Sequence, residues 1–488
     1  MRLVDIYIND RGLSMYLKRL ELFNHPILGN FNMDFTNASG SIAKNIIIAG
    51  ENGTGKSTLL DVIFDFSKIN TNSGKARNEV RTFTCIVDAN ELAIMKNFPD
   101  LSSYFANGVL NNELILKQDF NIINNWDHVK ISFVDNTGNN QQFNGRPINR
   151  LNESSSIFKC VYSDVEINYI PNSISSVTSK DVDLKNIQSV KSNANIATEI
   201  SQLLVDVQAL DDADLSAWVR DNPGQVPSNS IIDIRMNRFK KAFDFMFKGK
   251  KMEGIKNVDG TKKVIFKENG NEIFIDKLSS GEKQIVFRGS FLLMNQKSIA
   301  GTLILVDEPE ISMHPSWQSR IVDFYKKLFV STSGVQISQL FFVTHSEMVL
   351  SSNLNKADTL VVRLEKDATT NAITSTRINA PFILPVMTSA EVDYFVFNIC
   401  SIDYHIQLFN YIPVKYAMRS NSVKSIDSKI KRHSSFVPAR HSRTTSYDTT
   451  TYDTLPSYIR NEIHHALPTT FTIDELRESL ELLIEICK

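Results

Sequence analysis

The fold is decided by one stretch, Asn45-Ile-Ile-Ile-Ala-Gly50-Glu-Asn-Gly53-Thr-Gly55-Lys56-Ser57-Thr58. Its apolar start has the length of a buried strand, and the helical periodicity that follows predicts a helix from Ser57 to Phe66. Glycines separated by four residues and followed by Lys-Ser, between a strand and a helix, are typical of a phosphate-binding P-loop. The alternative is a glycine-rich turn that binds nothing.

The residue types in this stretch suit phosphate binding. Glycines let backbone N–H groups curl around phosphate oxygens, and the helix N-terminus adds partial positive charge. We expect Lys56 to reach the β- and γ-phosphates and Ser57 to offer its hydroxyl to Mg²⁺. The predicted nucleotide-binding residues are Gly50, Glu51, Asn52, Gly53, Thr54, Gly55, Lys56, Ser57 and Thr58.

A second apolar run, Leu303-Ile-Leu-Val306, ends in Asp307 and Glu308. A buried parallel strand presents such carboxylates at its C-terminal edge. We expect Asp307 to orient Mg²⁺, partly through water, and Glu308 to polarise the attacking water as general base. A strand that ends in solvated acids is the alternative, and the neighbouring P-loop favours the catalytic interpretation.

A third motif, Leu278-Ser279-Ser280-Gly281-Glu282-Lys-Gln284, opens another helix with Ser279 as its cap. A helix N-terminus with small residues offers a second anion site, which one ATP molecule cannot obviously share with the P-loop. Ordinary helix capping is the alternative.

These motifs, together with Phe342-Val-Thr-His345-Ser346, occur in the order found in ABC-type ATPases. The chain resembles that family, in which ATP is sandwiched between the P-loop of one subunit and the signature helix of another. The resemblance implies ATP and Mg²⁺ as cofactors, and a homodimer or higher homo-oligomer. It also implies trans contacts from Ser279, Ser280, Gly281 and Glu282, and a catalytic His345 that senses the γ-phosphate. A lone histidine after an apolar strand is otherwise more often a core residue.

The stretch after Glu308 departs from transporter motors. It reads Glu310-Ile-Ser-Met-His314-Pro-Ser-Trp-Gln318, which resembles the SMC, RecF and OLD-like branch of ABC ATPases. The glutamine of the usual Q-loop has no clear counterpart. The candidates are Asp164, Glu166, Gln141 and Gln142.

Composition fits a soluble globular protein. The 488 residues include 53 Lys+Arg and 54 Asp+Glu, and 42% are hydrophobic. Four scattered cysteines fit neither a metal cluster nor a disulfide framework, which indicates a reducing compartment. The acids near the N-terminus do not suit a signal peptide, and the apolar runs are far shorter than the roughly 20 residues that span a bilayer. We expect a cytoplasmic protein with no membrane association.

The predicted fold is α/β, with a P-loop ABC-type ATPase head in residues 1–400. This head, a mixed sheet with helices, has a helical or mixed insertion at about 90–260 between the P-loop and the signature motif. No heptad repeat is sustained between Thr58 and Leu278, which excludes a long coiled-coil arm. Asn269-Gly270 predicts a hairpin turn within Val264–Ile275. Residues 401–488 should form a small α-helical module.

A basic, Ser-rich linker is predicted at about 415–450. Between Lys415 and Arg443, eight Lys or Arg residues face only one acid, Asp427. A solvated linker is favoured over an arm that binds nucleic acid.

The C-terminal module contains Tyr458-Ile-Arg460-Asn461-Glu-Ile-His464-His465. Arg460 and His464 lie four residues apart, on one helix face. An arginine that holds phosphate and a histidine that moves protons are enough for metal-independent RNA cleavage. The pattern resembles the active-site helix of HEPN ribonucleases, as in anticodon nucleases of the PrrC and RloC type. The segment Asp403-Tyr404-His405 of the preceding helix is a further candidate contributor. A structural Arg/His cluster and a partner-docking surface are the alternatives.

The whole layout resembles stand-alone bacterial defence ATPases, in particular PtuA-type subunits of Septu and retron systems, which work beside a separate nuclease. The resemblance implies an ATPase whose ATP-bound dimer controls a nuclease in antiphage defence, either a partner or its own C-terminal module. Transfer RNA or DNA is a possible target. An SMC- or RecF-like DNA-repair ATPase, an ATPase-fused HEPN ribonuclease and a non-enzymatic, nucleotide-locked scaffold are the competing hypotheses. The missing coiled-coil arm and the near-neutral core count against the DNA-repair hypothesis.

Overall fold

The computed structural model contains two compact units, residues 1–377 and 378–488. It describes residues 15–37, 39–69, 78–122, 125–155, 158–165, 171–178, 190–192, 195–228, 232, 235–293, 301–330, 335–354, 356–378, 382–447, 450–464 and 470–488. Among these, no helix is both long enough and apolar enough to cross a membrane.

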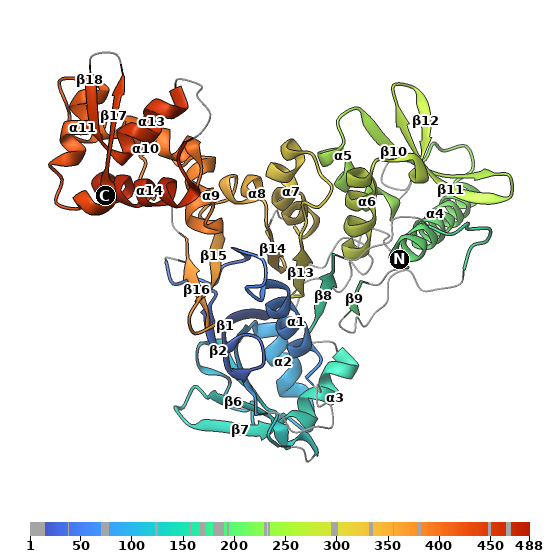
Figure 1. Ribbon diagram of the computed structural model, residues 1–488. Helices are drawn as coiled ribbons and strands as arrows, with labels where there is room; N and C mark the ends of the chain where they lie inside the picture. Colours follow the sequence, from blue (N-terminus) through green and yellow to red (C-terminus); the bar gives the residue numbers. More distant parts are fainter. Residues whose placement is uncertain are drawn as a thin grey trace. The chain divides into compact units, whose positions relative to one another are not determined.

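The central sheet of the first unit has the strand order β16-β15-β3-β14-β13-β8-β9 (Figure 1). The strands are β3 (Asn45–Gly50), β8 (Cys160–Ser163), β9 (Val190–Lys191), β13 (Leu303–Asp307), β14 (Gln339–Val343), β15 (Thr359–Lys366) and β16 (Ile373–Arg377). All neighbours pair in parallel except β15 and β16. Every residue of β3, β13 and β14 is buried, because both faces of a parallel sheet are covered. The C-terminal ends of these strands therefore lie along one sheet edge.

A second, antiparallel sheet has the order β2-β1-β4-β5-β6-β7. Its strands are β1 (Met15–His25), β2 (Gly29–Asp34), β4 (Val80–Val87), β5 (Glu113–Asp119), β6 (Val129–Val134) and β7 (Asn140–Asn144), with α2 (Ala89–Asn97) between β4 and β5 and α3 (Gly145–Ser155) after β7. Helix α1 (Lys56–Ser67) shares one apolar core with this sheet and the central one. Because it is packed by both sheets, α1 is buried on most of its sides.

The third layer is the antiparallel sheet β10-β11-β12. It consists of β10 (Lys250–Val258), β11 (Thr261–Glu268) and β12 (Asn271–Phe274), packed with α4 (Ile196–Asp221), α5 (Met236–Met246) and α6 (Ser280–Leu293). The predicted hairpin is confirmed: Asn269 and Gly270 have φ angles of 50° and 85°. The stretch 90–260 thus forms no single insertion, since β5 to β7 complete the second sheet and α4, α5 and β10 build the third layer. Helices α7 (Pro315–Leu328) and α8 (Glu347–Ser351) follow.

The second unit packs helices around a core of its own. Its elements are α9 (Ser389–Phe397), α10 (Ile402–Lys415), α11 (Val423–Lys431), α12 (Pro438–His441), β17 (Ser442–Tyr447), β18 (Thr450–Thr454), α13 (Leu455–His464) and α14 (Ile473–Cys487). It begins at residue 378, earlier than the expected 401, because Leu384 and Ala390 belong to this core. The β17–β18 hairpin also makes it more than a purely helical module.

The described residues within 415–450 are folded, in contrast to the predicted linker. Ile426 and Ile430 of α11 are buried. Between them, the Asp427 carboxylate accepts hydrogen bonds from the Thr454 backbone N–H at 3.1 Å and the Thr454 hydroxyl at 2.7 Å. This buried contact ties α11 to the strand β18, so the segment is part of the domain.

Three of the eight basic residues in this segment pair with acids within the second unit. Lys431 pairs with Asp453 at 2.6 Å, Arg440 with Glu478 at 3.0 Å, and Arg443 with Glu475. The Lys415 ammonium donates to the Cys487 carbonyl at the end of α14. These pairings favour a structural role over a phosphate-binding arm.

Candidate nucleotide-binding site

The loop between β3 and α1 depends on glycine at its two ends. Gly50 and Gly55 have φ angles of 140° and 83°, which L-residues rarely adopt. A Cβ at Gly50 would lie 2.3 Å from the Leu364 carbonyl oxygen of β15, and one at Gly55 would lie 2.6 Å from Leu28 Cδ2. The β15 backbone therefore leaves no room for a Cβ at Gly50, whereas a Cβ at Gly55 would require the Leu28 side chain to move.

Lys56 lies buried at the first position of α1. Its ammonium donates to the carbonyls of Gly50 at 3.0 Å and Glu51 at 2.7 Å. Burial lowers the pKa of Lys56 to about 8, while nearby carboxylates, Asp307 and Glu308 first among them, oppose the shift. The loop lysine and the carboxylates after β13 are thus electrostatic neighbours.

Asp307 closes the buried strand β13 and is 1% exposed. Burial raises its pKa, while a hydrogen bond with the Ser57 side chain lowers it. The Tyr162 hydroxyl lies 3.4 Å from Oδ2, but among the described residues no group donates to the buried Oδ1. A buried carboxylate oxygen without a partner, beside a serine hydroxyl, fits a divalent cation. Ser57 and Asp307 are the residues that would hold Mg²⁺.

Glu308 and His345 face each other beside this cluster. Glu308 has a φ of 44°, and its N–H donates to the Val343 carbonyl at 2.9 Å. His345 Nε2 lies 3.7 Å from Glu308 Oε1, with the two side chains 33% and 31% exposed. Burial and then the charge of Lys56 lower the pKa of His345, against the opposing effect of Glu308. His345 is therefore neutral near pH 7, able to accept one hydrogen bond and donate another.

Glu310 positions the loop that contains His345, a role that the sequence did not reveal. Its carboxylate accepts hydrogen bonds from the Thr344 hydroxyl at 2.7 Å and the His345 N–H at 2.9 Å. Burial raises the pKa of Glu310, and its second oxygen has no partner among the described residues. The carboxylate thus joins the end of β13 to the end of β14.

Arg288 of α6 is a second residue that sequence analysis missed. It is fully buried, and its guanidinium donates to the carbonyls of Asp307 at 2.8 Å, Glu308 at 3.0 Å and Asp164 at 2.7 Å. The sequence signal that could have identified this role is an arginine within the apolar run that follows the signature motif. Arg288 links the signature helix directly to the backbone of the two carboxylates.

The signature turn lies at the exposed start of α6. The Glu282 carboxylate accepts from the Ser279 N–H at 2.8 Å, and the Ser279 hydroxyl accepts from the Glu282 N–H at 3.3 Å. Ser279 and Ser280 are exposed, whereas Gly281 is buried, and a Cβ there would lie 2.8 Å from the Ser312 carbonyl oxygen. Within the part of the chain that the structure describes, no hydrogen bond joins Ser279 or Ser280 to the P-loop.

Of the three Q-loop candidates among the described residues, Asp164 alone lies near the site. Its charge contributes to the raised pKa of Asp307, and its carboxylate pairs with Lys191 at 2.9 Å. Gln141 and Gln142 belong to β7 of the second sheet, where Gln141 donates to Asp135 at 3.1 Å. Glu166 lies outside the described residues.

The residues of the second candidate site make mostly local contacts. Arg460 donates to the neighbouring Asn461 Oδ1 at 3.1 Å, and the buried Asn461 Nδ2 finds no acceptor among the described residues. His464 is exposed at the end of α13, and His465 lies outside the described residues. His405 is fully buried against the Ser479 hydroxyl at 2.9 Å, and burial lowers its pKa to about 3. His405 is thus a core residue, not a proton donor at a surface site.

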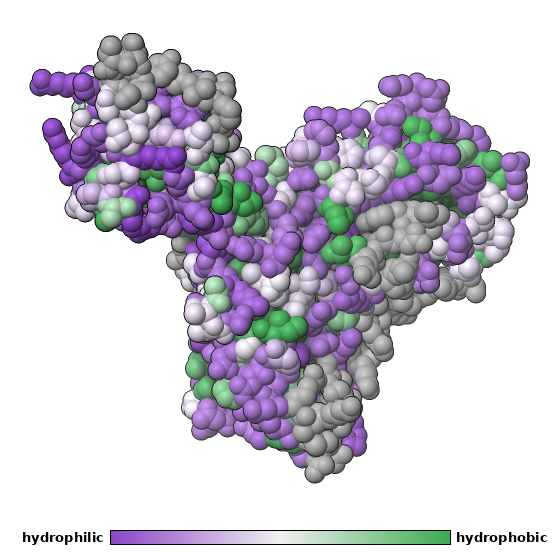
Figure 2. Space-filling view, viewed as in Figure 1, coloured by the Kyte–Doolittle hydropathy of each residue, from purple (hydrophilic) through white to green (hydrophobic). Residues whose placement is uncertain are grey.

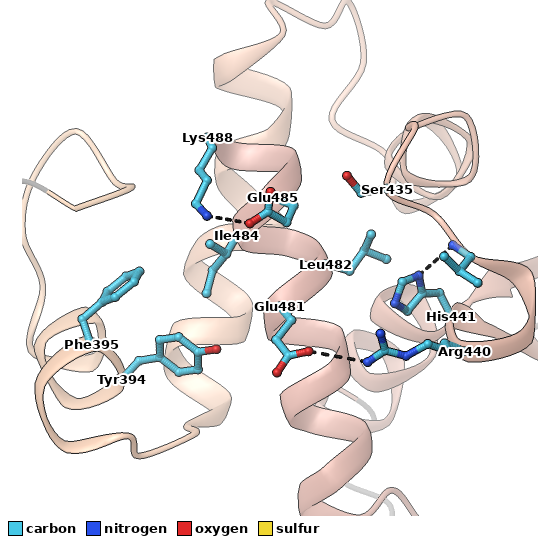
Figure 3. A pocket seen from close by; sticks show the side chains of 11 residues that line it. Tyr394, Phe395, Ser435, Arg440, His441, Glu481, Leu482, Ile484, Glu485 and Lys488 are labelled. Carbon is cyan, nitrogen blue, oxygen red and sulfur yellow. Dashed lines mark hydrogen bonds and ion pairs between the residues drawn. The ribbon is translucent and has the colours of Figure 1, made fainter. Parts of the chain in front are cut away.

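A pocket of about 470 Å³ in the second unit lies between α9, α12 and α14 (Figure 3). Its lining includes Tyr394 and Phe395 but none of Arg460, Asn461 and His464. The charged groups around it pair with one another, since Arg440 approaches Glu481 at 3.6 Å and Lys488 donates to Glu485 at 2.5 Å. The pocket therefore adds nothing to the Arg460 cluster.

Residues 161–352 match the family described as "AAA domain, putative AbiEii toxin, Type IV TA system". This match covers 192 of the 488 residues. The matched part begins in β8 and includes the signature turn, Asp307, Glu308 and His345, whereas the P-loop precedes it. No curated protein matches the chain as a sequence relative.

Among solved structures, the matches include SMC head domains. The head from Pyrococcus furiosus, with an extended coiled coil and bound to the C-terminal domain of ScpA, is 12% identical, with 75% of this chain and 97% of that chain covered and a TM-score of 0.40. A head bound to the C-winged helix domain of ScpA is 14% identical, with coverages of 75% and 98% and a TM-score of 0.41. The head from Thermotoga maritima is 14% identical, with coverages of 75% and 99% and a TM-score of 0.36. Likenesses this distant say nothing about activity.

Proposed function

We propose that this protein binds and hydrolyses ATP, and that two copies enclose the nucleotide between the P-loop of one and the signature turn of the other. The observation that supports this most is the convergence of Lys56, Ser57, Asp307, Glu308 and His345 at one sheet edge, around a buried carboxylate oxygen without a partner. The AAA domain supports ATPase activity in general terms.

Each residue has a role in this proposal that follows from its chemistry. Lys56 and the N–H groups of residues 50–58 bind the phosphates, and Ser57 with Asp307 holds the cation. Mg²⁺, when bound, supplies positive charge that offsets the charge developing on the phosphates. Glu308 accepts the proton of the attacking water. The neutral His345, held by Glu310, faces Glu308 and reports the state of the γ-phosphate.

The exposed signature turn explains why dimerisation is part of the proposal. Ser279 and Ser280 have small side chains at a helix N-terminus, which attracts anions, and they make no hydrogen bond to the P-loop of the same chain in the described residues. A second copy can bring them to the γ-phosphate, and Arg288 then connects that contact to Asp307 and Glu308.

A Glu308→Gln variant provides the test, because it should bind ATP without hydrolysing it. Light scattering with Mg²⁺ and ATP should show a dimer or a larger assembly that is absent without nucleotide. A variant that binds ATP but keeps the same mass would contradict the sandwich. Lys56→Ala, which should not bind ATP, is the matched control.

We further propose that the ATP-bound dimer controls a nuclease in antiphage defence. The resemblance to PtuA-type subunits and the family match to an AbiEii-type AAA domain support this. The nuclease is either a partner docked on the second unit or the Arg460 cluster itself. Purified protein that cleaves transfer RNA, with cleavage lost in Arg460→Ala, would identify the cluster as the nuclease. Equal cleavage by both proteins would rule out the Arg460 cluster as the nuclease, and no cleavage by either would favour a docked partner.

A further inference from the structure

A basic surface that the ATPase proposal does not use lies on the sheet β10-β11-β12. Residues 248–267 contain seven lysines and two acids, and Glu268 and Glu272 follow in the rest of the sheet. The near-neutral charge of the whole chain conceals this concentration. Hydrophilic side chains dominate the surface over these strands (Figure 2).

One face of this sheet is apolar and buried. Met252 pairs with Phe266 across β10 and β11, and both are buried. The Phe266 ring packs against Phe243 and Phe247, with centroids 6.4 and 6.0 Å away. Directly opposed residues point to the same face of an antiparallel sheet, so the face of Met252 and Phe266 rests on α5.

The other face presents lysines in two cross-strand pairs. Lys251 opposes Lys267, and Lys256 opposes Lys263. We name these four residues the lysine face. Lys251, Lys256 and Lys267 are exposed, and Lys263 is half-buried with its ammonium 5.0 Å from the centre of the Phe274 ring.

A β-bulge in β10 creates this arrangement. The register shifts between Met252 and Gly254, so Glu253 is an extra residue. Without the shift, Lys251 and Lys256, five positions apart, would point to opposite faces. On β11, Lys263 and Lys267 are four residues apart, which places the two lysine pairs about 13 Å from each other.

The acids beside the lysine face neutralise it only in part. Lys256 pairs with Glu272 at 2.6 Å and Lys267 approaches Glu253 at 3.7 Å, with all four side chains 45–49% exposed. Such exposed pairs are weak and screened by salt, so phosphate can replace them. Lys251 has no acidic partner in the described part of the chain.

The same strand is connected to the signature turn. Lys250, the first residue of β10, is buried, and its ammonium lies 2.6 Å from Glu282 Oε1. Glu282 in turn accepts from the Ser279 N–H. A shift of β10 on ligand binding can therefore change the position of the residues that the ATPase proposal assigns to the γ-phosphate.

We propose that the lysine face binds the phosphate backbone of duplex DNA, and that this binding affects the signature turn through β10. The second part rests on the proposed ATPase function, and the first does not. The distance between the two lysine pairs is close to the roughly 12 Å width of the B-DNA major groove. Duplex RNA has a deep, narrow major groove, and single strands need exposed aromatic platforms, whereas Phe274 lies beneath Lys263.

Fluorescence anisotropy with a short, mixed-sequence duplex DNA tests the binding. In the double variant Lys251→Glu/Lys263→Glu, each new glutamate stands opposite a remaining lysine, so the sheet gains cross-strand ion pairs and should fold. We expect duplex affinity to fall about tenfold or more, and the salt dependence to become shallower by roughly two phosphate contacts. The double variant Arg419→Glu/Lys424→Glu, with the same charge change on exposed residues of the second unit, should bind as the wild type does.

Unchanged duplex affinity in the first double variant, or an equal loss in the second, would overturn the assignment. Tighter binding of duplex RNA, transfer RNA or anionic lipid vesicles than of duplex DNA would overturn it as well.

The link to the signature turn has a separate readout. Duplex DNA should change the rate of ATP hydrolysis by the wild type, and Lys250→Met should keep the duplex affinity but lose this response. An ATP hydrolysis rate that duplex DNA does not change would refute the link. If the wild type hydrolyses no ATP while duplex binding still depends on Lys251 and Lys263, the ATPase proposal fails and the lysine face stands.

Discussion

The two candidate sites of this molecule are built in opposite ways. In the first unit, Ser57 and Asp307 come from separate segments and meet at a carboxylate with one oxygen that no described residue satisfies, and His345 faces the adjacent Glu308. In the second unit, Arg460 pairs with its neighbour Asn461. Distant residues that bring a serine hydroxyl beside an unpartnered carboxylate oxygen fit a cation, whereas the unpartnered atom of the second cluster, Asn461 Nδ2, is a donor next to the adjacent Arg460. A cluster that is local in sequence gives no such indication.

The largest expected effect is on ATP hydrolysis, which should depend on the first site and not on the second. Glu308→Gln should reduce ATP hydrolysis by about 10²- to 10⁴-fold, because a positioned general base contributes that much. Arg460→Ala should leave hydrolysis unchanged. Steady-state phosphate release measures both variants. Comparable losses of ATP hydrolysis in the two would contradict the distinction between the two sites.

Removal of the buried arginine should destabilise the first unit. Arg288→Met leaves the carbonyls of Asp307, Glu308 and Asp164 without their donor, at a cost of about 3 kcal/mol in the free energy of unfolding. Arg440→Met, which removes exposed ion pairs of the second unit, should have no measurable effect. Urea unfolding compares them, and a small effect of Arg288→Met would show that the three carbonyls find other donors.

Acid should destabilise the second unit through His405. Burial lowers its pKa from 6.5 to about 3 in the folded state. The unfolded chain binds a proton below pH 6.5 and the folded chain does not, so this stability is present above pH 6.5 and is lost as the pH falls toward 3. Between pH 7 and 5 the loss should be about 2 kcal/mol.

The variant His405→Gln, which cannot titrate, serves as the control for this loss. Urea unfolding of the second unit at both pH values measures it. An equal acid response in the wild type and the variant would assign the loss to other groups.

The smallest expected effect is on ATP binding, and it compares two glycines with similar backbone angles. Gly55 and Gly260 have φ angles of 83° and 74°, so alanine at either should cost about 1–2 kcal/mol. Only at Gly55 does the new methyl also meet Leu28, while nothing lies within 4 Å of a Cβ at Gly260. Gly55→Ala should therefore weaken binding of a fluorescent ATP analogue, and Gly260→Ala should not. Equal binding by both would show that the loop tolerates the methyl.

Contiguous motifs made part of this structure predictable. The P-loop strand and helix, and the turn at Asn269-Gly270, depend on neighbouring residues and follow from spacing and backbone preference. The roles of Glu310 and Arg288 depend on tertiary contacts between β13, β14 and α6, which spacing does not encode. The lysine face was hidden for a similar reason, because a bulge at Glu253 changes which side chains share a face.

The predicted linker at 415–450 illustrates the limits of composition. Its basic residues suggested a solvated segment, but their partners Glu475 and Glu478 lie later in the sequence. The apolar pair Ile426 and Ile430, four residues apart, was the signal for a packed helix.

Subunit complementation tests the shared ATP site most directly. Lys56→Ala and Ser279→Arg should each be inactive alone, because each homodimer lacks one half of both composite sites. Mixed in equal amounts, they should regain roughly a quarter of the wild-type hydrolysis, since half of the dimers then contain one intact site of two. A mixture as inactive as its components, in protein shown to exchange subunits, would contradict the account.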